Sequence, residues 1–125
     1  PKKDMMRIVA AHDIPYAATA CISYPLDYMQ KVEKASKVNA PTYIHVLVPC
    51  PTGWGFAPER TIEIGRMAVE SGLWKLMEFE HGEFRITHKP SRRRPVAEYF
   101  AAQARFRHLR PEEIAAIQRE IDASE

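Results

Sequence analysis

The residues from Thr42 to Trp54, TYIHVLVPCPTGW, constrain the fold of this chain more than any other stretch. They begin with a β-branched and aromatic run, which Pro49, Cys50 and Pro51 end abruptly. A run of this kind, bounded by turn residues, predicts a buried strand that delivers Cys50 to its carboxyl end. Because ligands bind at that end of the strands in open α/β sheets, we expect any chemistry to lie near Cys50.

A strand, a helix and a second strand follow one another in the first half of the chain. Small apolar residues predict a strand over residues 16–22, and Pro25 suits the first turn of the helix that follows. The spacing predicts one buried apolar stripe and one water-facing side for this helix. The stripe comprises Leu26, Met29, Val32 and Ala35, and the water-facing side comprises Lys31, Glu33, Lys34 and Lys37. With the strand over residues 42–48 this makes a βαβ unit, which implies parallel strands and a right-handed crossover.

The rest of the chain predicts four more helices and a β-hairpin. A short helix over residues 2–12 is capped by Asp4. A helix from Pro58 ends at Gly72, and a hairpin joins alternating runs over residues 73–79 and 84–88. Two last helices are predicted over residues 96–106 and from Pro111 onward. The apolar sides of these last three helices are, in order, Ile62, Met67 and Val69; Val96, Tyr99, Phe100 and Ala104; and Ile114, Ile117 and Ile121.

Composition argues against several classes of protein. The net charge of +2 does not by itself indicate a nucleic-acid partner. No apolar stretch approaches the ~18 residues of a transmembrane helix, and no signal peptide is visible. Cys21 and Cys50 are too few for a disulfide framework. We therefore expect both to be reduced and the protein to be cytoplasmic.

Two interpretations of Cys50 follow from the residues alone. Between two prolines at a strand end, its thiol is held rigidly and suits iron–sulfur ligation. A lone cysteine in an apolar strand is more commonly packed in the core, and a cluster usually needs four thiolates, more than this chain holds. Cys21, inside a strand of small residues, is expected in the core.

The histidines carry weaker signals. His45 alternates with apolar neighbours in its strand, where a buried, hydrogen-bonded histidine is the common outcome and a proton donor the rarer one. The others, His12, His81, His88 and His108, show no metal-ligand spacing. No nucleophile–base pattern, dinucleotide-binding loop or Walker loop appears.

The segment from Arg85 to Arg110 is basic, with Glu98 as its single acid, and the charge bias reverses after Pro111. With aromatic residues nearby, such a segment could bind RNA. It also fits a solvated face or a contact with an acidic subunit, and the near-neutral net charge argues against nucleic acid. A standalone protein- or RNA-interaction module without catalysis is therefore the alternative function.

Two parallel strands cannot by themselves form a stable open sheet, because both faces and both edges would lack cover. The chain also begins at Pro1 rather than at a methionine. We therefore expect its strands to belong to a larger sheet, completed by further residues or by another chain. The predicted division is an α/β domain over residues 1–57 and an arm of helix, hairpin and helices over residues 58–125. We expect the arm to pack on a partner subunit or on a symmetry-related copy of its own subunit.

Four stretches carry a resemblance to a known family. They are YAATACISYPLDYMQKVEKA, APTYIHVLVPCPTGWGF, ERTIEIGRMAVESGLWKLMEFEHG and ITHKPSRRRPVAEYFAAQARFRHL. Over essentially its whole length the chain resembles the carboxyl-terminal third of a β subunit of the 2-oxoacid:ferredoxin oxidoreductases, above all the multi-subunit type that oxidises pyruvate. The V-P-C-P-T-G-W stretch is the most specific part, and the K-P-x-x-R-x-P-V-x-E-Y arm supports it.

The resemblance implies an α/β thiamine-diphosphate-binding fold, in which a parallel sheet has flanking helices. It also implies thiamine diphosphate with Mg²⁺ and one 4Fe–4S cluster. The family's A-P-C or S-P-C motif corresponds to Val48-Pro49-Cys50 here, which makes Cys50 the fourth cluster ligand. The thiamine motif and the other three cluster cysteines are absent from this chain, so no catalytic or thiamine-binding residue is assigned to it.

The activity that the resemblance implies is the oxidative decarboxylation of pyruvate to acetyl-CoA and CO2. Electrons pass through the cluster to ferredoxin, and coenzyme A accepts the acetyl group. The implied partners are the other subunits of the complex and ferredoxin, and this chain alone is expected to be inactive. The sequence leaves open which 2-oxoacid is used, and whether Trp54 and Phe56 cover the cluster or touch a partner.

Overall fold

The chain folds into two compact units in a computed structural model that describes residues 2–125. The first unit contains the residues up to Leu47 together with Lys75–Lys89. The second contains Val48–Trp74 together with Pro90–Glu125. The predicted hairpin therefore belongs with the amino-terminal strands, although the sequence analysis assigned it to the carboxyl-terminal arm. The division at residue 57 stays a prediction about the complete subunit.

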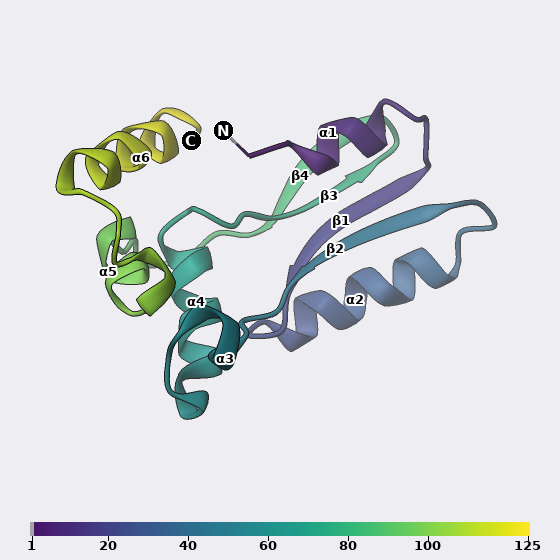
Figure 1. Ribbon diagram of the computed structural model, residues 1–125. Coiled ribbons are helices and arrows are strands. Elements are labelled where there is room, and N and C mark those ends of the chain that lie inside the picture. Colours follow the sequence, from purple (N-terminus) through teal and green to yellow (C-terminus); the bar gives the residue numbers. More distant parts are fainter. Residues whose placement is uncertain (1) are drawn as a thin grey trace. The chain divides into compact units, whose positions relative to one another are not determined.

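A four-stranded mixed sheet forms the centre of the first unit (Figure 1). Its strands are β1 (Tyr16–Cys21), β2 (Thr42–Leu47), β3 (Leu76–Glu80) and β4 (Glu83–His88), in the order β2-β1-β3-β4. β1 and β2 are parallel, as predicted, with Tyr16 opposite Thr42. β3 pairs with β1 in the antiparallel sense, so the hairpin extends the same sheet.

The small residues of β1 make it the buried centre of the unit. All of its six residues are buried, and four are alanine or cysteine without exposed area. Side chains of this size let helices approach both faces of a strand closely. β2 is one of the two edge strands of this four-stranded sheet and is only half-buried, so the sequence prediction of a buried strand there was wrong.

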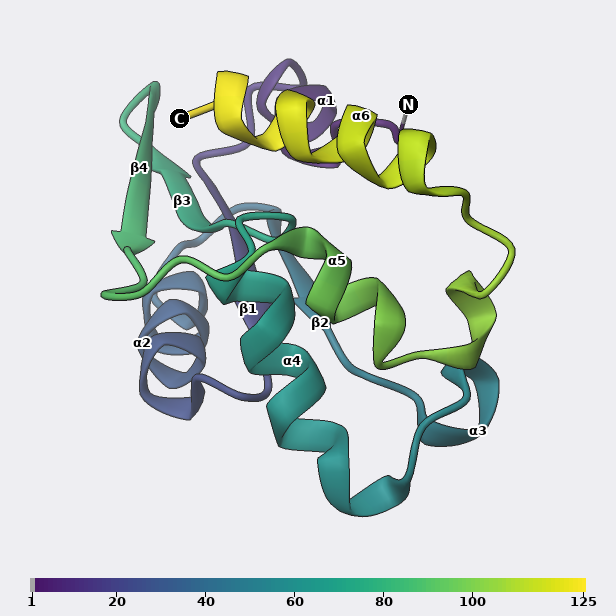
Figure 2. The same cartoon turned by 90° about the vertical axis from the view of Figure 1, so that its left-hand side faces the viewer.

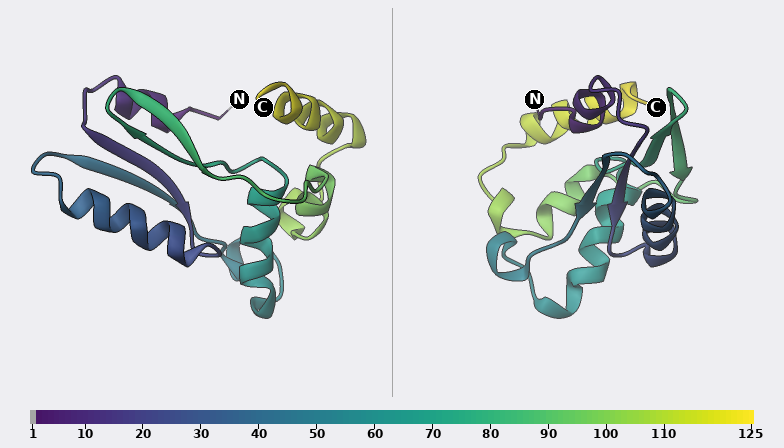
Figure 3. Two further views of the ribbon diagram at one scale, coloured as in Figure 1. Left: turned by 180° about the vertical axis from the view of Figure 1, so that it is seen from behind. Right: turned by 90° about the vertical axis from the view of Figure 1, so that its right-hand side faces the viewer.

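Two helices flank this sheet, α1 (Met5–Ala10) and α2 (Pro25–Ser36). They lie on opposite sides of it, with α2 along β1 and β2 (Figures 1 and 3). Both starts follow the predicted signals. The Asp4 carboxylate accepts a hydrogen bond from the amide of Arg7 at 3.1 Å, and Pro25 occupies the first turn of α2.

The sequence analysis assigned the wrong face of α2 to the core. Leu26, Met29 and Val32 are 74%, 66% and 46% exposed. Lys31, predicted to face water, is buried at 1% exposure. Its ammonium group finds acceptors on the sheet, so a cation lies inward where the apolar pattern predicted a hydrophobic stripe.

The hairpin has the turn that its sequence predicts. His81 and Gly82 connect the strands, with φ angles of 54° and 79°. Two successive residues with positive φ form the type of two-residue turn whose twist matches that of paired strands. The predicted runs therefore meet as β3 and β4.

Helices make up the second unit (Figure 2). They are α3 (Pro51–Trp54), η1 (Pro58–Arg60), α4 (Thr61–Glu70), α5 (Val96–Ala101), η2 (Ala104–Phe106) and α6 (Pro111–Ala123). The core of the unit includes Ile64, Met67, Val69, Val96 and Phe100. Two predicted core residues lie outside: Ile62 is 45% exposed, and Ala104 is exposed because α5 ends at Ala101.

The structure confirms the α/β fold class. It has a parallel β1–β2 pair, flanking helices and a carboxyl-terminal helix, as expected of a thiamine-diphosphate-binding type of fold. Within residues 2–125, no helix combines the length and the apolar character that a membrane span requires.

Candidate functional site

The turn that carries Cys50 begins three residues after the end of β2. Pro49 is buried, and Cys50 follows it with an exposed side chain. Cys50 is the residue that caps the amino terminus of α3, with an extended backbone at φ −110° and ψ 104°. Prolines on both sides restrict the backbone here, which presents the thiol in a defined direction.

Hydrogen bonds of the turn converge on Cys50. The amide of Gly53 donates to the Cys50 Sγ at 3.4 Å, and the amide of Trp54 donates to the Cys50 carbonyl oxygen at 2.9 Å. A Cβ atom on Gly53 would lie 3.3 Å from Sγ, so a glycine lets the backbone approach the sulfur closely. A backbone amide that donates to a sulfur makes the kind of contact that the ligand sulfurs of iron–sulfur clusters accept.

Cys50 has the chemistry of one ligand, and the rest of a metal site would have to come from elsewhere. The described part of the chain contains no group of three or more histidine, cysteine, aspartate or glutamate side chains placed to hold a metal ion. A cluster that requires four thiolates therefore fits here only with ligands from residues outside this chain. The thiol of Cys50 is exposed and accepts a hydrogen bond from the Gly53 amide, so it is suited to be one of four ligands of such a cluster.

Cys21 differs from Cys50 in every respect that matters for ligation. It lies at the end of β1 with no exposed area, and burial raises the pKa of its thiol. A buried, protonated thiol is a poor metal ligand. The expected core position is confirmed, and both cysteines are free.

The histidines named in the sequence analysis are spread over the structure. His45 is half-buried on β2, with its ring 6.0 Å from that of Tyr43. His88, at the end of β4, packs on Tyr24 with 4.8 Å between the ring centres. Neither lies in a group of potential metal ligands within residues 2–125.

Arginines of the basic segment that lie in the second unit pair with acids of that unit. Arg94 contacts Glu70 at 2.6 Å, and Arg93 pairs with Glu125. Arg110 contacts Glu113, whose carboxylate also accepts a hydrogen bond from the Arg110 amide at 2.8 Å. These acids lower the positive potential that a nucleic-acid surface requires.

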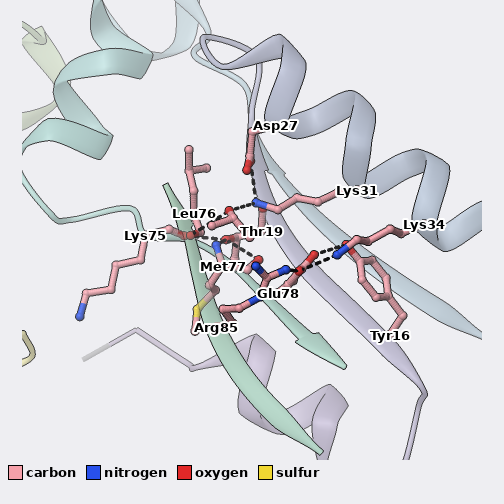
Figure 4. Close-up of polar contacts among 11 residues, drawn as sticks. Tyr16, Thr19, Asp27, Lys31, Lys34, Lys75, Leu76, Met77, Glu78 and Arg85 are labelled. Atoms are coloured by element: carbon pink, nitrogen blue, oxygen red, sulfur yellow. Dashed lines mark hydrogen bonds and ion pairs between the residues drawn. The ribbon is translucent and has the colours of Figure 1, made fainter. Parts of the chain in front are cut away.

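Sequence reasoning missed a buried polar network in the first unit (Figure 4). The Lys31 Nζ donates to the Thr19 carbonyl oxygen at 2.8 Å, to Asp27 at 2.6 Å and to Thr87 at 2.7 Å.

Glu78 forms the second part of this network. It is 2% exposed, accepts hydrogen bonds from Tyr16 at 2.9 Å and Lys34 at 2.8 Å, and pairs with Arg85. Because partners satisfy these charged groups, the network stabilises the unit rather than forming a reactive site. The Asp27–Lys31 spacing of four residues was the one sequence signal for it.

The chain is similar to subunits of known oxidoreductases. It is 62% identical over 122 residues to pyruvate synthase subunit PorB of Methanocaldococcus jannaschii, across 98% of this chain and 41% of the relative. It is 56% identical over 123 residues to the subunit of the same name from Methanothermobacter thermautotrophicus, across 98% and 43%. It is 40% identical over 120 residues to ketoisovalerate oxidoreductase subunit VorB of Pyrococcus abyssi, across 94% and 39%. No protein-family model matches the chain.

These similarities confirm the resemblance on which the sequence analysis relied. The chain corresponds to the carboxyl-terminal part of the pyruvate synthase subunits. It spans about two fifths of the length of these relatives.

Proposed function

Because the chain matches the carboxyl-terminal part of β subunits of 2-oxoacid:ferredoxin oxidoreductases, we propose that it serves in an enzyme that oxidatively decarboxylates pyruvate. The products are acetyl-CoA and CO2, and the electrons go to ferredoxin. The observation that carries this proposal is the 62% identity over 98% of the chain to a subunit named pyruvate synthase. Pyruvate is the proposed substrate because the relatives that are 62%, 56% and 51% identical are all named pyruvate synthase. The subunit named for ketoisovalerate is 40% identical, and one pyruvate synthase subunit, from Pyrococcus furiosus, is 38% identical.

In this proposal Cys50 is the fourth ligand of a 4Fe–4S cluster. Its exposed thiol and the Gly53 amide that donates to Sγ support the assignment. When bound, such a cluster passes single electrons, and hydrogen bonds to its sulfur ligands help set its reduction potential. The part played by this chain is to hold the thiolate, direct it and stabilise its charge.

The remaining cofactors and partners belong to the complete enzyme. Thiamine diphosphate with Mg²⁺ would be bound mainly by residues outside this chain. The other subunits, ferredoxin and coenzyme A would meet the assembled complex, and this chain alone would be inactive. A cytoplasmic location belongs to the same proposal, supported by the two free cysteines.

The iron content and reduced EPR spectrum of the complete enzyme test the role of Cys50. We expect Cys50→Ala to remove or change one 4Fe–4S signal and to lower pyruvate-dependent ferredoxin reduction, because the cluster loses a thiolate. Cys21→Ala is the matched control, since it removes a cysteine from the core of the same chain. We expect it to keep the signal.

An unchanged spectrum and unchanged activity in Cys50→Ala would show that Cys50 is not a cluster ligand and reduce the family match to a statement about fold. Ferredoxin reduction with ketoisovalerate in place of pyruvate tests the substrate separately. A clear preference for ketoisovalerate would overturn the proposed substrate and leave the cluster assignment untouched.

A further inference from the structure

A cation–π contact joins the turn that carries Cys50 to η2, within the second unit. The guanidinium carbon of Arg105 lies 3.7 Å from the centre of the Trp54 ring and 4.3 Å from that of Phe106. We infer that Arg105 is a positioning residue that holds the Cys50 turn in the geometry needed for ligation. This inference rests on the proposed function for the meaning of that geometry, but the contact can be tested by itself.

The Arg105 guanidinium is itself held in place by buried groups. Its Nε donates to the Gln103 Oε1 at 2.8 Å, and one terminal nitrogen donates to the Tyr99 hydroxyl at 3.1 Å. Gln103 and Tyr99 are 2% and 3% exposed, and the Gln103 amide nitrogen donates to the Tyr99 carbonyl oxygen at 2.7 Å. A planar group fixed at two of its nitrogens presents a rigid face to the indole ring of Trp54.

A backbone contact reinforces the side-chain contact. The amide of Ala104 donates to the carbonyl oxygen of Gly55 at 2.9 Å. A Cβ atom on Gly55 would lie 2.6 Å from the Ala104 Cβ, so only glycine allows this approach. Arg105 and Ala104 therefore fix two successive residues, Trp54 and Gly55, at the carboxyl end of α3.

Movement at that end of α3 reaches the thiol through a short chain of hydrogen bonds. The Trp54 amide donates to the Cys50 carbonyl oxygen, and the neighbouring Gly53 amide donates to Sγ. If the Trp54 ring loses its partner, both amides gain freedom, and the bond to sulfur weakens. Weaker donation to a ligand sulfur lowers the reduction potential of an iron–sulfur cluster, because the more negative reduced state loses stabilisation.

The test compares Arg105→Ala and Arg105→Lys with Arg107→Ala in the complete enzyme. Lysine keeps the charge but lacks the planar, two-nitrogen geometry. Arg107 lies two positions later and is exposed, and within residues 2–125 it forms no ion pair or ring contact. Arg107→Ala therefore controls for the loss of one positive charge. Hydrogen exchange of the peptide spanning residues 50–57 reports on the turn, and an EPR-monitored redox titration reports on the cluster.

We expect both Arg105 variants to exchange this peptide faster, by about tenfold, which is the scale of losing one half-buried cation–π contact. We also expect both to lower the potential of the cluster, while Arg107→Ala changes neither. Wild-type exchange in Arg105→Ala, or wild-type behaviour of Arg105→Lys in both measurements, would overturn the inference.

Cys50→Ala in the same series separates this inference from the proposed function. If Cys50→Ala changes the cluster signal while the Arg105 variants match wild type, Cys50 is a ligand and the positioning role fails. If Cys50→Ala leaves the signal intact, the ligand assignment fails, and with it the role of Arg105 in ligation. The exchange data then still decide whether Arg105 holds the turn.

Discussion

Glu78 shows how the sheet supplies partners to a buried carboxyl group. Three groups surround it: the hydroxyl of Tyr16, the ammonium group of Lys34 and the guanidinium group of Arg85. Burial of a charge without such partners costs several kcal/mol, so removal of one partner costs more than that partner's contact contributes. Tyr16 and Glu78 are 62 positions apart in the sequence, and this hydrogen bond exists only because β1 and β3 pair.

The raised pKa of the Tyr16 phenol predicts that the folded protein loses stability at alkaline pH. Burial, and then the negative charges of Glu80 and Asp27, raise the pKa of its phenol from 10.0 to about 12. In the unfolded chain the group ionises at its ordinary value, so the unfolded state binds fewer protons between these two values. The stabilisation from neutral Tyr16 is therefore complete below pH 10 and is lost as the pH rises through about 12.

Urea unfolding of the protein across that pH range measures this effect. We expect the free energy of unfolding to fall with rising pH, and Tyr16→Phe to flatten the decline, because phenylalanine has no proton to lose. An equally steep decline in Tyr16→Phe would show that other groups cause it.

Lys31 is a lysine whose side chain is buried although its sequence pattern predicts exposure to water. Its hydrocarbon stem crosses the packed face of α2, and its ammonium group reaches acceptors 12 and 56 positions away. Burial lowers its pKa, while the carboxylate of Asp27 acts in the opposite direction. A pattern that classes every lysine as solvent-facing cannot anticipate this, because long cationic side chains pack their stems and place their charge wherever acceptors exist.

At the scale of elements, the turn after α3 depends on a close approach to Ala104. Gly55 has a φ of 74°, and an added Cβ would collide with the Ala104 Cβ. Gly82, in the β3–β4 turn, has a φ of 79° but no atom within 4 Å of the position of a Cβ. The two glycines therefore separate the cost of backbone strain from the cost of a clash.

We expect Gly82→Ala to lower the free energy of unfolding by about 1 kcal/mol, through strain alone. Gly55→Ala should lower it by roughly 2–4 kcal/mol, because overpacking adds to the same strain. Urea titrations of both variants give the comparison. Equal losses would mean that the loop around Ala104 moves aside at little cost.

Two helices also show where periodicity alone fails. α2 exposes its apolar stripe because the sheet offers acceptors to the cation on the other side of the helix. α5 ends at Ala101, and η2 begins at Ala104, although the apolar pattern continued to Phe106. The chain turns there, and Arg105 meets Trp54. In both cases a tertiary contact outweighed local propensity.

At the scale of the whole molecule, β2 has one open edge. It pairs only with β1 among the described residues, and its sequence has no lysine, glutamate or proline to protect the other side. Open parallel edges of this kind are normally covered. Relatives more than twice as long as this chain contain residues that could supply that cover.

We therefore expect a further strand on β2 in the complete subunit. Hydrogen exchange should then show protection of all the amides over residues 42–47, since those not bonded to β1 would bond to the added strand. Fast exchange of alternate amides would show that the edge is open. The amide of Val46 reports on an added strand better than that of Thr42, because Thr42 is exposed at the start of β2.

The sequence by itself determined where most of the elements lie and which known subunits the chain resembles. The strands, the parallel pair, the hairpin turn, the cap at Asp4 and the helix start at Pro25 depend on residues close together in the chain. Local patterns predict them well. The strand-end pattern also drew attention to Cys50, and the resemblance then implied its role as a cluster ligand. Only the tertiary structure decided which face of α2 is buried, which partners surround Glu78 and that Arg105 stacks on Trp54. Each of these depends on partners remote in sequence, and the free energy of their contacts exceeds the small local preferences that a pattern can register.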